Sequence, residues 1–268
     1  MAGTPANTRT LCVGIDPHAS VLEAWECADT EAGLASFVSA IVPALSASGV
    51  SVVKPQVAFF ERHGVAGMRQ LAVLLGELRA QGITVIGDAK RGDIGSTMAG
   101  YAEAWLRPGS DFEVDFLTVV PYQGVGSLTP VLDLAARHSK GVFVLAATSN
   151  PEANETQSAV RADGKSLAHG VVDDLALWVR ENPGTQSHIG VVVGATVDLA
   201  DFGLDLRDYA GMPILAPGFG YQGAKLSQAK SLFPDTSPVY AVVARSILLS
   251  GEAGMADSVR TADIELRS

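Results

Sequence analysis

Apolar runs rich in valine and isoleucine recur along the whole chain. They occupy residues 11–15, 50–53, 83–86, 116–120, 142–146, 189–193, 213–216 and 239–243. Each run is continuous and does not alternate apolar with polar positions, which is typical of parallel strands covered on both faces. The pattern therefore predicts eight buried parallel strands.

The segments between these runs carry helical periodicity. Apolar residues recur at steps of three and four in three of them: Leu34, Phe37, Val38, Ile41 and Leu45; Met68, Leu71, Leu74, Leu75 and Leu78; and Leu128, Val131, Leu132 and Ala135. Regular alternation of strand and helix predicts a parallel α/β fold. Eight repeats favour a closed (β/α)8 TIM barrel over an open doubly wound sheet. No linker interrupts the pattern, so we predict a single domain over residues 1–268, with residues 1–10 as a disordered or loosely held N-terminal arm.

Composition narrows the class of protein. The chain has 268 residues, of which 47% are hydrophobic and 18% charged, as expected for a globular protein with a large core. A net charge of -10 argues against nucleic acid as a partner, although a few local cations can still hold one phosphate. Cys12 and Cys27 show neither metal-ligand spacing nor a disulfide framework, and the first residues lack an apolar signal core, so a cytoplasmic location is expected. We expect no apolar run to be long enough to span a bilayer, and therefore no membrane partner.

The stretch after the third strand concentrates charge. Asp88 and Lys90 are two residues apart, a spacing that points both side chains to the same side of a strand end, and Asp93 follows past a glycine. An ammonium held among carboxylates is costly to bury and often serves catalysis. The alternative is a salt bridge between solvated loop charges, which is common for an isolated Asp-x-Lys.

Other polar residues follow the remaining strands. Asp16 comes after the first, Lys54 after the second, Ser149 after the fifth and Arg245 after the eighth. In a barrel all these positions lie at the carboxyl-terminal face, where active sites are built. Taken singly, Asp16 could be a turn residue and Lys54 a solvated strand end, but their convergence favours a site.

A phosphate site is predicted at the last two strand ends. Residues 216–223 are rich in glycine, which allows backbone N–H groups to approach a ligand. Arg245 can grip a phosphate with two parallel hydrogen bonds, and the loops after strands seven and eight of barrels are frequent phosphate sites. An ordinary flexible turn and a surface charge at a helix start are the alternatives. Residues 152–157 read as a polar loop, either solvated or part of a lid.

These residues, in this order, resemble those of the orotidine 5'-phosphate decarboxylase family. The resemblance is carried by Gly14-Ile15-Asp16, Lys54, the run 88–94, Pro217-Gly218 and Ala244-Arg245-Ser246, and it extends from the first strand to the eighth. The chain is similar to the longer bacterial subgroup, with Lys-Arg-Gly-Asp at 90–93, Lys-Pro-Gln at 54–56 and Ala-Thr-Ser-Asn-Pro at 147–151.

The resemblance implies decarboxylation of orotidine 5'-monophosphate to uridine 5'-monophosphate and CO2 without metal or cofactor, the last step of pyrimidine nucleotide synthesis. It implies a charged array of catalytic residues and a homodimer in which part of each site comes from the neighbouring subunit. The implied array is Lys54, Asp88, Lys90 and Asp93, with Asp93 and Thr97 reaching across the dimer; Asp16 and Lys54 would hold ribose hydroxyls, Ser149 the pyrimidine, and Gln222, Arg245 and the backbone of Gly220 the phosphate.

Two other functions remain as alternatives. A Mg2+-dependent sugar-phosphate lyase or decarboxylase of the same suprafamily shares Asp-x-Lys-x-x-Asp, but such enzymes carry a metal-binding glutamate at the end of the second strand, where this chain has Lys54. A cation there would repel the metal. A non-catalytic barrel that binds a phosphate ligand is disfavoured because mere binding does not need Lys90 flanked by two carboxylates.

Overall fold

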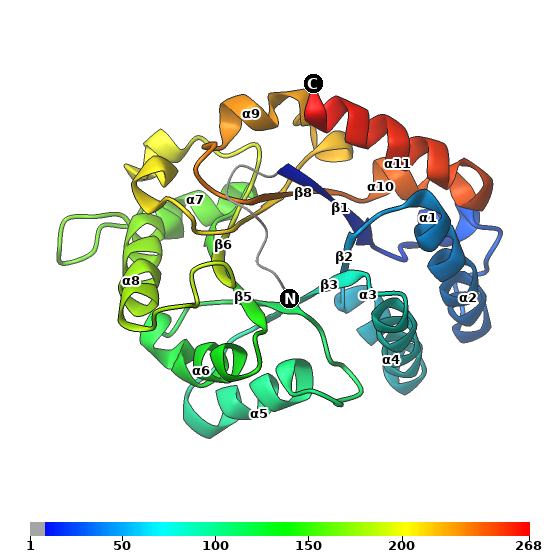
Figure 1. Cartoon of the computed structure of the whole chain (residues 1–268), viewed down its shortest axis with the longest axis horizontal. Coiled ribbons are helices and arrows are strands. Elements are labelled where there is room, and N and C mark those ends of the chain that lie inside the picture. The colour runs from blue at the N-terminus through cyan, green and yellow to red at the C-terminus, as the bar shows by residue number, and fades with distance from the viewer. Residues whose placement is uncertain (1–8) are drawn as a thin grey trace.

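The computed structural model describes residues 9–268, which form a closed parallel barrel surrounded by helices (Figure 1). The strands are β1 (Arg9–Ile15), β2 (Val52–Pro55), β3 (Thr84–Arg91), β4 (Phe116–Val119), β5 (Gly141–Ala147), β6 (Ile189–Val193), β7 (Ile214–Pro217) and β8 (Val239–Val243). Each strand pairs with the next in the sequence, and β8 pairs with β1 to close the ring. The (β/α)8 barrel predicted from the apolar runs is confirmed.

Helices fill the connections between the strands. They are α1 (Ala19–Ala24), α2 (Glu31–Ser48), α3 (Ala58–Glu61), α4 (Gly64–Ala80), α5 (Gly95–Leu106), α6 (Thr129–Arg137), α7 (Pro151–Gln157), α8 (Leu167–Glu181), α9 (Ala229–Leu232), α10 (Arg245–Leu248) and α11 (Gly251–Arg267). The three periodic segments of the sequence correspond to α2, α4 and α6, so these helices are confirmed. Short 3-10 turns replace a long helix between β6 and β7.

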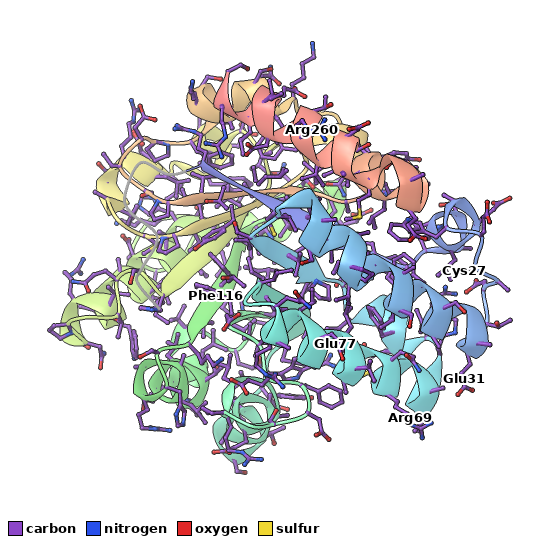
Figure 2. All side chains as sticks on the ribbon, turned by 45° about the vertical axis from the view of Figure 1, so that its right-hand side comes forward. Cys27, Glu31, Arg69, Glu77, Phe116 and Arg260 are labelled. Atoms are coloured by element: carbon purple, nitrogen blue, oxygen red, sulfur yellow. The ribbon has the colours of Figure 1, made fainter. Side chains whose placement is uncertain are left out.

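Helix α2 is the most apolar of the long helices. The Thr30 hydroxyl accepts a hydrogen bond from the Gly33 N–H at its start, and Gly49 ends it with φ +74°. Among the helices of residues 9–268, α2 alone is long and apolar enough to cross a membrane, judged by length and composition only. The expectation that no apolar run was long enough to span a bilayer was therefore wrong. Its inner face, which includes Phe37 and Ile41, is buried in the core. It lies beside α4 and α11 on the outside of the barrel (Figure 2).

The barrel separates two apolar cores. The larger core lies between the strands and the surrounding helices. The smaller one fills the interior of the barrel with Cys12, Val52, Ile86, Phe116, Phe143, Val192, Leu215, Tyr240 and Val242. Within it, the rings of Phe116 and Phe143 stack with centroids 5.2 Å apart, and Tyr240 packs against both. The inner face of the ring is therefore a packed core and not a channel.

Some boundaries differ from those expected. Arg9 and Thr10 belong to β1 and not to a loose arm, because they pair with Val239 and Tyr240 of β8; residues 1–8 of that predicted arm lie outside the described residues. The polar stretch 152–157 forms most of the exposed helix α7, which starts with Pro151 at its first turn, a favoured position for proline.

Strand β3 differs most from its prediction. It continues through the charged residues to Arg91, five positions past the expected end at Ile86. Its pairing with β4 shifts on the way: Gly87 lies opposite Leu117, but Arg91 lies opposite Val119. Three residues of β3, at positions 88–90, thus face the single residue Thr118 of β4. The irregularity is a β-bulge, a feature that often occurs next to active sites.

Candidate active site

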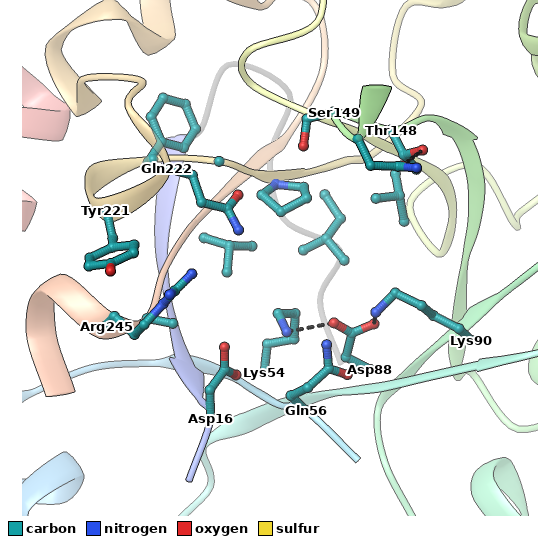
Figure 3. Close-up of a pocket in the computed structure, with 18 of the residues that line it drawn as sticks. Asp16, Lys54, Gln56, Asp88, Lys90, Thr148, Ser149, Tyr221, Gln222 and Arg245 are labelled. Atoms are coloured by element: carbon teal, nitrogen blue, oxygen red, sulfur yellow. Dashed lines mark hydrogen bonds and ion pairs between the residues drawn. The ribbon is translucent and has the colours of Figure 1, made fainter. Parts of the chain in front are cut away.

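A cavity of about 250 Å3 opens at the carboxyl ends of the strands (Figure 3). Leu145, Val192, Leu215 and Val242 form an apolar floor that it shares with the barrel interior. Its polar lining comprises Asp16, Lys54, Gln56, Asp88, Lys90, Thr148, Ser149, Asn150, Tyr221, Gln222 and Arg245. The convergence of the predicted strand-end residues Asp16, Lys54, Asp88, Lys90, Ser149 and Arg245 is therefore observed, and Gln222 joins them.

Asp88 lies between two lysines. Lys54 Nζ is 2.6 Å from Asp88 Oδ2, and Lys90 Nζ is 2.6 Å from Asp88 Oδ1 (Figure 3). The side chains of Lys54 and Asp88 are almost wholly buried, whereas that of Lys90 is 43% exposed at the cavity mouth. Lys54 is therefore not a solvated strand end, and in the Asp88–Lys90 pair only the lysine is partly exposed to solvent. Lys90 is the member of the array that a ligand can reach most easily.

Burial and pairing act in opposite directions on this array. Burial alone would raise the pKa of Asp88, but the ammonium groups of Lys54 and Lys90 outweigh it and hold that pKa below its usual range. Burial alone would lower the pKa of Lys54, but the carboxylates of Asp88 and Asp16 outweigh it and raise that pKa. Lys54 and Asp88 therefore form a fixed ion pair over a wide range of pH.

Asp16 approaches the cavity from the end of β1. Burial raises its pKa, with Lys54 acting against the shift. Its Oδ1 atom is buried and makes no hydrogen bond. Buried carboxylate oxygens in folded proteins normally have a donor, so this atom is a ready acceptor for a ligand hydroxyl.

Small residues bring β1 and β8 close together beside Asp16. A Cβ atom on Gly14 would lie 2.6 Å from Cβ of Ala244. Real Cβ atoms do not approach so closely, so glycine is needed at position 14 while Ala244 keeps its place. Arg245 follows directly, as the first residue of α10.

The predicted phosphate side of the cavity carries a stacked pair. The Arg245 guanidinium carbon lies 3.8 Å from the centroid of the Tyr221 ring. Gln222 also reaches the cavity, on the side away from Lys90 (Figure 3). Gly220 differs from its prediction: it is not among the cavity-lining residues, and its N–H donates to the Ala224 carbonyl at 2.8 Å. The turn therefore uses this amide itself, whereas the side chains of Gln222 and Arg245 carry donors at the cavity.

Ser149 lies on an exposed turn after β5. Its neighbour Thr148 is held by Gln157 of α7: the Thr148 N–H donates to Gln157 Oε1 and the Thr148 hydroxyl accepts from Gln157 Nε2, both at 2.9 Å. Helix α7 is thereby tied to the end of β5. This contact fixes the backbone next to Ser149 even though Ser149 itself is exposed.

Asp93 and Thr97 do not line the cavity of their own chain. Asp93 Oδ1 accepts a hydrogen bond from the Ile94 N–H at 2.8 Å, just before α5 begins. Thr97 lies on the exposed first turn of α5. Among the ion pairs of residues 9–268, none joins Asp93 to Lys90. A single chain thus assembles the array without its second carboxylate.

Sequence reasoning missed two residues that line the cavity and one, Thr118, that lies behind its wall. Gln56 and Tyr221 stood inside motifs that were recognised, but no role was assigned to either. Thr118 was counted within an apolar run, although it is the only polar residue of β4. That exception was the one signal that could have marked it.

The arrangement defines the chemistry that the cavity can perform. An exposed ammonium, fixed by a buried carboxylate, can stabilise negative charge and donate a proton. The apolar floor suits a planar ring, and Arg245 suits a phosphate. Within residues 9–268 no group of three or more His, Cys, Asp or Glu side chains is arranged to hold a metal ion.

Comparisons with known proteins agree with this chemistry. Residues 9–256 match the family described as Orotidine 5'-phosphate decarboxylase / HUMPS. A Corynebacterium glutamicum protein named orotidine 5'-phosphate decarboxylase is 48% identical over 250 residues, which cover 92% of this chain and 88% of the relative. A Streptomyces coelicolor protein of the same name is 49% identical over 226 residues, or 83% of this chain and 78% of the relative.

Solved structures agree as well. A crystal structure of a candidate orotidine 5'-phosphate decarboxylase from Streptomyces avermitilis superposes with a TM-score of 0.87 at 45% identity, covering 97% of this chain and 90% of that one. The similarity thus spans the whole barrel and includes every strand that contributes to the cavity. The chain belongs to the orotidine 5'-phosphate decarboxylase / HUMPS family.

Proposed function

We propose that this protein decarboxylates orotidine 5'-monophosphate to uridine 5'-monophosphate, with Lys90 as the catalytic acid. The observation that carries the proposal is the buried Asp88 carboxylate held 2.6 Å from both Lys54 and Lys90 at the wall of the cavity. This is the activity named for its relatives.

The difficult step of this reaction is the development of negative charge on one carbon, C6 of the pyrimidine ring. When the C6–carboxylate bond breaks, its electron pair stays on C6 and CO2 leaves. The Lys90 ammonium offers fixed positive charge where that pair develops, and it then donates a proton to C6 to give the product. Asp88 would crowd the substrate carboxylate, and that repulsion would end as CO2 departs.

The rest of the ligand meets the other walls. Arg245 and Gln222 take the phosphate, the unpaired Asp16 oxygen takes a ribose hydroxyl together with Lys54, and Ser149 binds the pyrimidine. The phosphate is remote from the bond that breaks. Its binding energy can still contribute to catalysis by closing the loops and excluding water.

The structure gives a reason to prefer this reaction over a Mg2+-dependent lyase. The second strand presents Lys54, whose ammonium is paired with Asp88. A divalent cation at this carboxylate would have to displace that ammonium or lie beside it, and both are unfavourable.

A spectrophotometric assay tests the proposal. Purified protein should consume orotidine 5'-monophosphate, form uridine 5'-monophosphate and keep its rate in excess EDTA. Loss of turnover in EDTA that added Mg2+ restores would favour the lyase. Binding of the nucleotide without turnover would favour the non-catalytic barrel.

The active unit is proposed to be a homodimer in which Asp93 and Thr97 enter the neighbouring site. The incomplete array within one chain supports this, as does the position of both residues outside their own cavity. Mixing inactive Lys90→Ala and Asp93→Asn proteins tests it. In a mixed dimer one site carries both changes and the other carries neither, so refolded mixtures should regain about a quarter of wild-type activity. If each Asp93 served its own subunit, mixing would restore nothing.

A cytoplasmic location is also proposed. Both cysteines are free thiols, Cys12 inside the barrel and Cys27 half-buried beside α1, which suits a reducing compartment. Fractionation of the source cells with detection by antibody would test it, and recovery outside the cytoplasm would contradict it.

A further inference from the structure

Thr118 occupies the gap that the β-bulge leaves between β3 and β4. Its neighbours on β4 pair regularly, Leu117 with Gly87 and Val119 with Arg91. Thr118 alone faces the three residues of β3 at positions 88–90, and it is 1% exposed. It does not line the cavity, so it does not meet a ligand directly.

The Thr118 hydroxyl makes two contacts with the charged array. Its Oγ1 accepts a hydrogen bond from the Lys90 backbone N–H at 3.0 Å and donates one to Asp88 Oδ1, also at 3.0 Å. A hydroxyl has one proton and two lone pairs, so it can do both at once. No apolar side chain could replace either contact.

Both contacts meet a local need. Lys90 has a φ of +48°, a left-handed conformation that costs free energy for a residue other than glycine. In the bulge its N–H bonds to the Thr118 side chain instead of a backbone carbonyl of β4. Asp88 Oδ1, which accepts the hydrogen bond from the Thr118 hydroxyl, also accepts one from the Lys90 ammonium. The hydroxyl therefore links the backbone of Lys90 to the carboxylate that holds its side chain.

We propose that Thr118 is a positioning residue, whose hydroxyl holds Lys90 and Asp88 in the geometry that the reaction needs. This inference rests on the proposed decarboxylation. It extends that function to a residue of β4 that touches no substrate and acts only through the two residues it binds.

Two substitutions separate the hydroxyl from the methyl group. Thr118→Val keeps the volume and removes the hydroxyl, and Thr118→Ser keeps the hydroxyl and removes a buried methyl. We expect kcat to fall roughly tenfold to a hundredfold in the valine variant, the size of effect that loss of a hydrogen bond to a charged group produces. The serine variant should stay within about threefold of wild type, since it keeps both hydrogen bonds. The dissociation constant for uridine 5'-monophosphate should be nearly unchanged in both.

A purely structural role predicts another pattern. Activity would then follow stability, and Thr118→Ser, which loses buried apolar area, would be impaired as much as Thr118→Val. Thr84→Val, the same chemical change at the other end of β3, is the matched control and should leave kcat unchanged. Comparable kcat losses in both Thr118 variants, or none in Thr118→Val, would overturn the proposal.

A readout without turnover keeps this test separate from the proposed activity. Amide hydrogen exchange of the Lys90 N–H, followed by NMR, should be faster in Thr118→Val than in wild type or Thr118→Ser. If the wild-type protein had no decarboxylase activity, the proposed function would fail while this measurement still decided whether Thr118 holds Lys90. Equal exchange in all three proteins would refute the positioning role.

Discussion

The guanidinium carbon of Arg245 lies 3.8 Å from the centroid of the Tyr221 ring. Arg245 begins helix α10 after β8, and Tyr221 lies in the loop after β7, so the stack joins the two loops that form the predicted phosphate side. Tyr221 is 63% exposed, so it contributes little to the core. Its ring instead holds the arginine in one orientation.

We expect Tyr221→Ala to lower kcat/KM by roughly threefold to thirtyfold, the range of a cation–π contact that is partly desolvated. The loss should arise mainly in KM, because the phosphate is remote from the reacting carbon. Steady-state kinetics measures it, with Tyr221→Phe as control. If the phenylalanine variant lost as much as alanine, the phenol oxygen would matter and not the stack.

Arg245→Ala should reduce kcat/KM more strongly, by about a hundredfold or more, since it removes a charge-assisted bidentate contact. The fold should remain intact, as judged by circular dichroism and thermal unfolding. Arg245→Lys keeps the positive charge but not the planar guanidinium, so its kcat/KM should lie between those of the wild type and Arg245→Ala. Unchanged kcat/KM in the alanine variant would remove Arg245 from the phosphate site.

Lys90→Ala should abolish measurable turnover and still bind uridine 5'-monophosphate, because the proton donor is lost while the phosphate and ribose contacts remain. Calorimetry gives the affinity and the spectrophotometric assay the rate. The variant should fold, since the Lys90 side chain is 43% exposed. Near-normal turnover would show that another group supplies the proton.

The Lys54–Asp88 pair predicts how stability depends on pH. The pKa of Asp88 lies below its usual 3.8, so its contribution to stability is complete above 3.8 and is lost as pH falls through the folded value. The pKa of Lys54 lies above its usual 10.5, so its contribution is complete below 10.5 and is lost as pH rises further. Denaturant unfolding should show Asp88→Ala to be less stable by about 3 kcal/mol between these limits. A difference that disappears near neutral pH would contradict the pairing.

Asp16 should behave in the opposite way. Burial raises its pKa, so ionisation of this group lowers stability as pH rises above 3.8. We expect Asp16→Asn to stabilise the free protein by about 1 kcal/mol at neutral pH and by little below 3.8, where both side chains are uncharged. Activity should fall, because the unpaired oxygen is the predicted ribose acceptor. A destabilised asparagine variant would show that the carboxylate is already satisfied.

The apolar pattern predicted the barrel because this fold buries both faces of every strand and one face of every long helix. Burial of this kind requires continuous apolar runs in the strands and helical spacing of apolar residues in the helices. It also predicted which polar residues meet, since Asp16, Lys54, Asp88 and Arg245 all follow from strand order. The pattern failed at β3, which was expected to end at Ile86. A run of charged residues in a sequence predicts a loop. Here the ion pair with Lys54 offsets the cost of burying Asp88, and Lys54 lies 34 positions away, beyond the range of a local pattern.

Contacts that depend on a particular local geometry were beyond the sequence. The bulge at positions 88–90 arises from the offset between two strands, and no residue pattern marks it. Gly220 was expected to offer its amide to a ligand, but the turn closes on that N–H through Ala224. Asp93 lies outside the cavity of its own chain, which strand order alone could not show.

The lack of room for a side chain on Gly14 beside Ala244 has a consequence for which ligands can bind. Asp16 stands two residues beyond the glycine and Arg245 one residue beyond the alanine, so the distance between their side chains depends on how closely Gly14 packs against Ala244. The contact between Gly14 and Ala244 thus keeps Asp16 and Arg245 at a fixed separation. With the ribose at Asp16 and the phosphate at Arg245, as proposed, a ligand that lacks one of these groups, such as a nucleoside without phosphate, cannot engage both side chains at once.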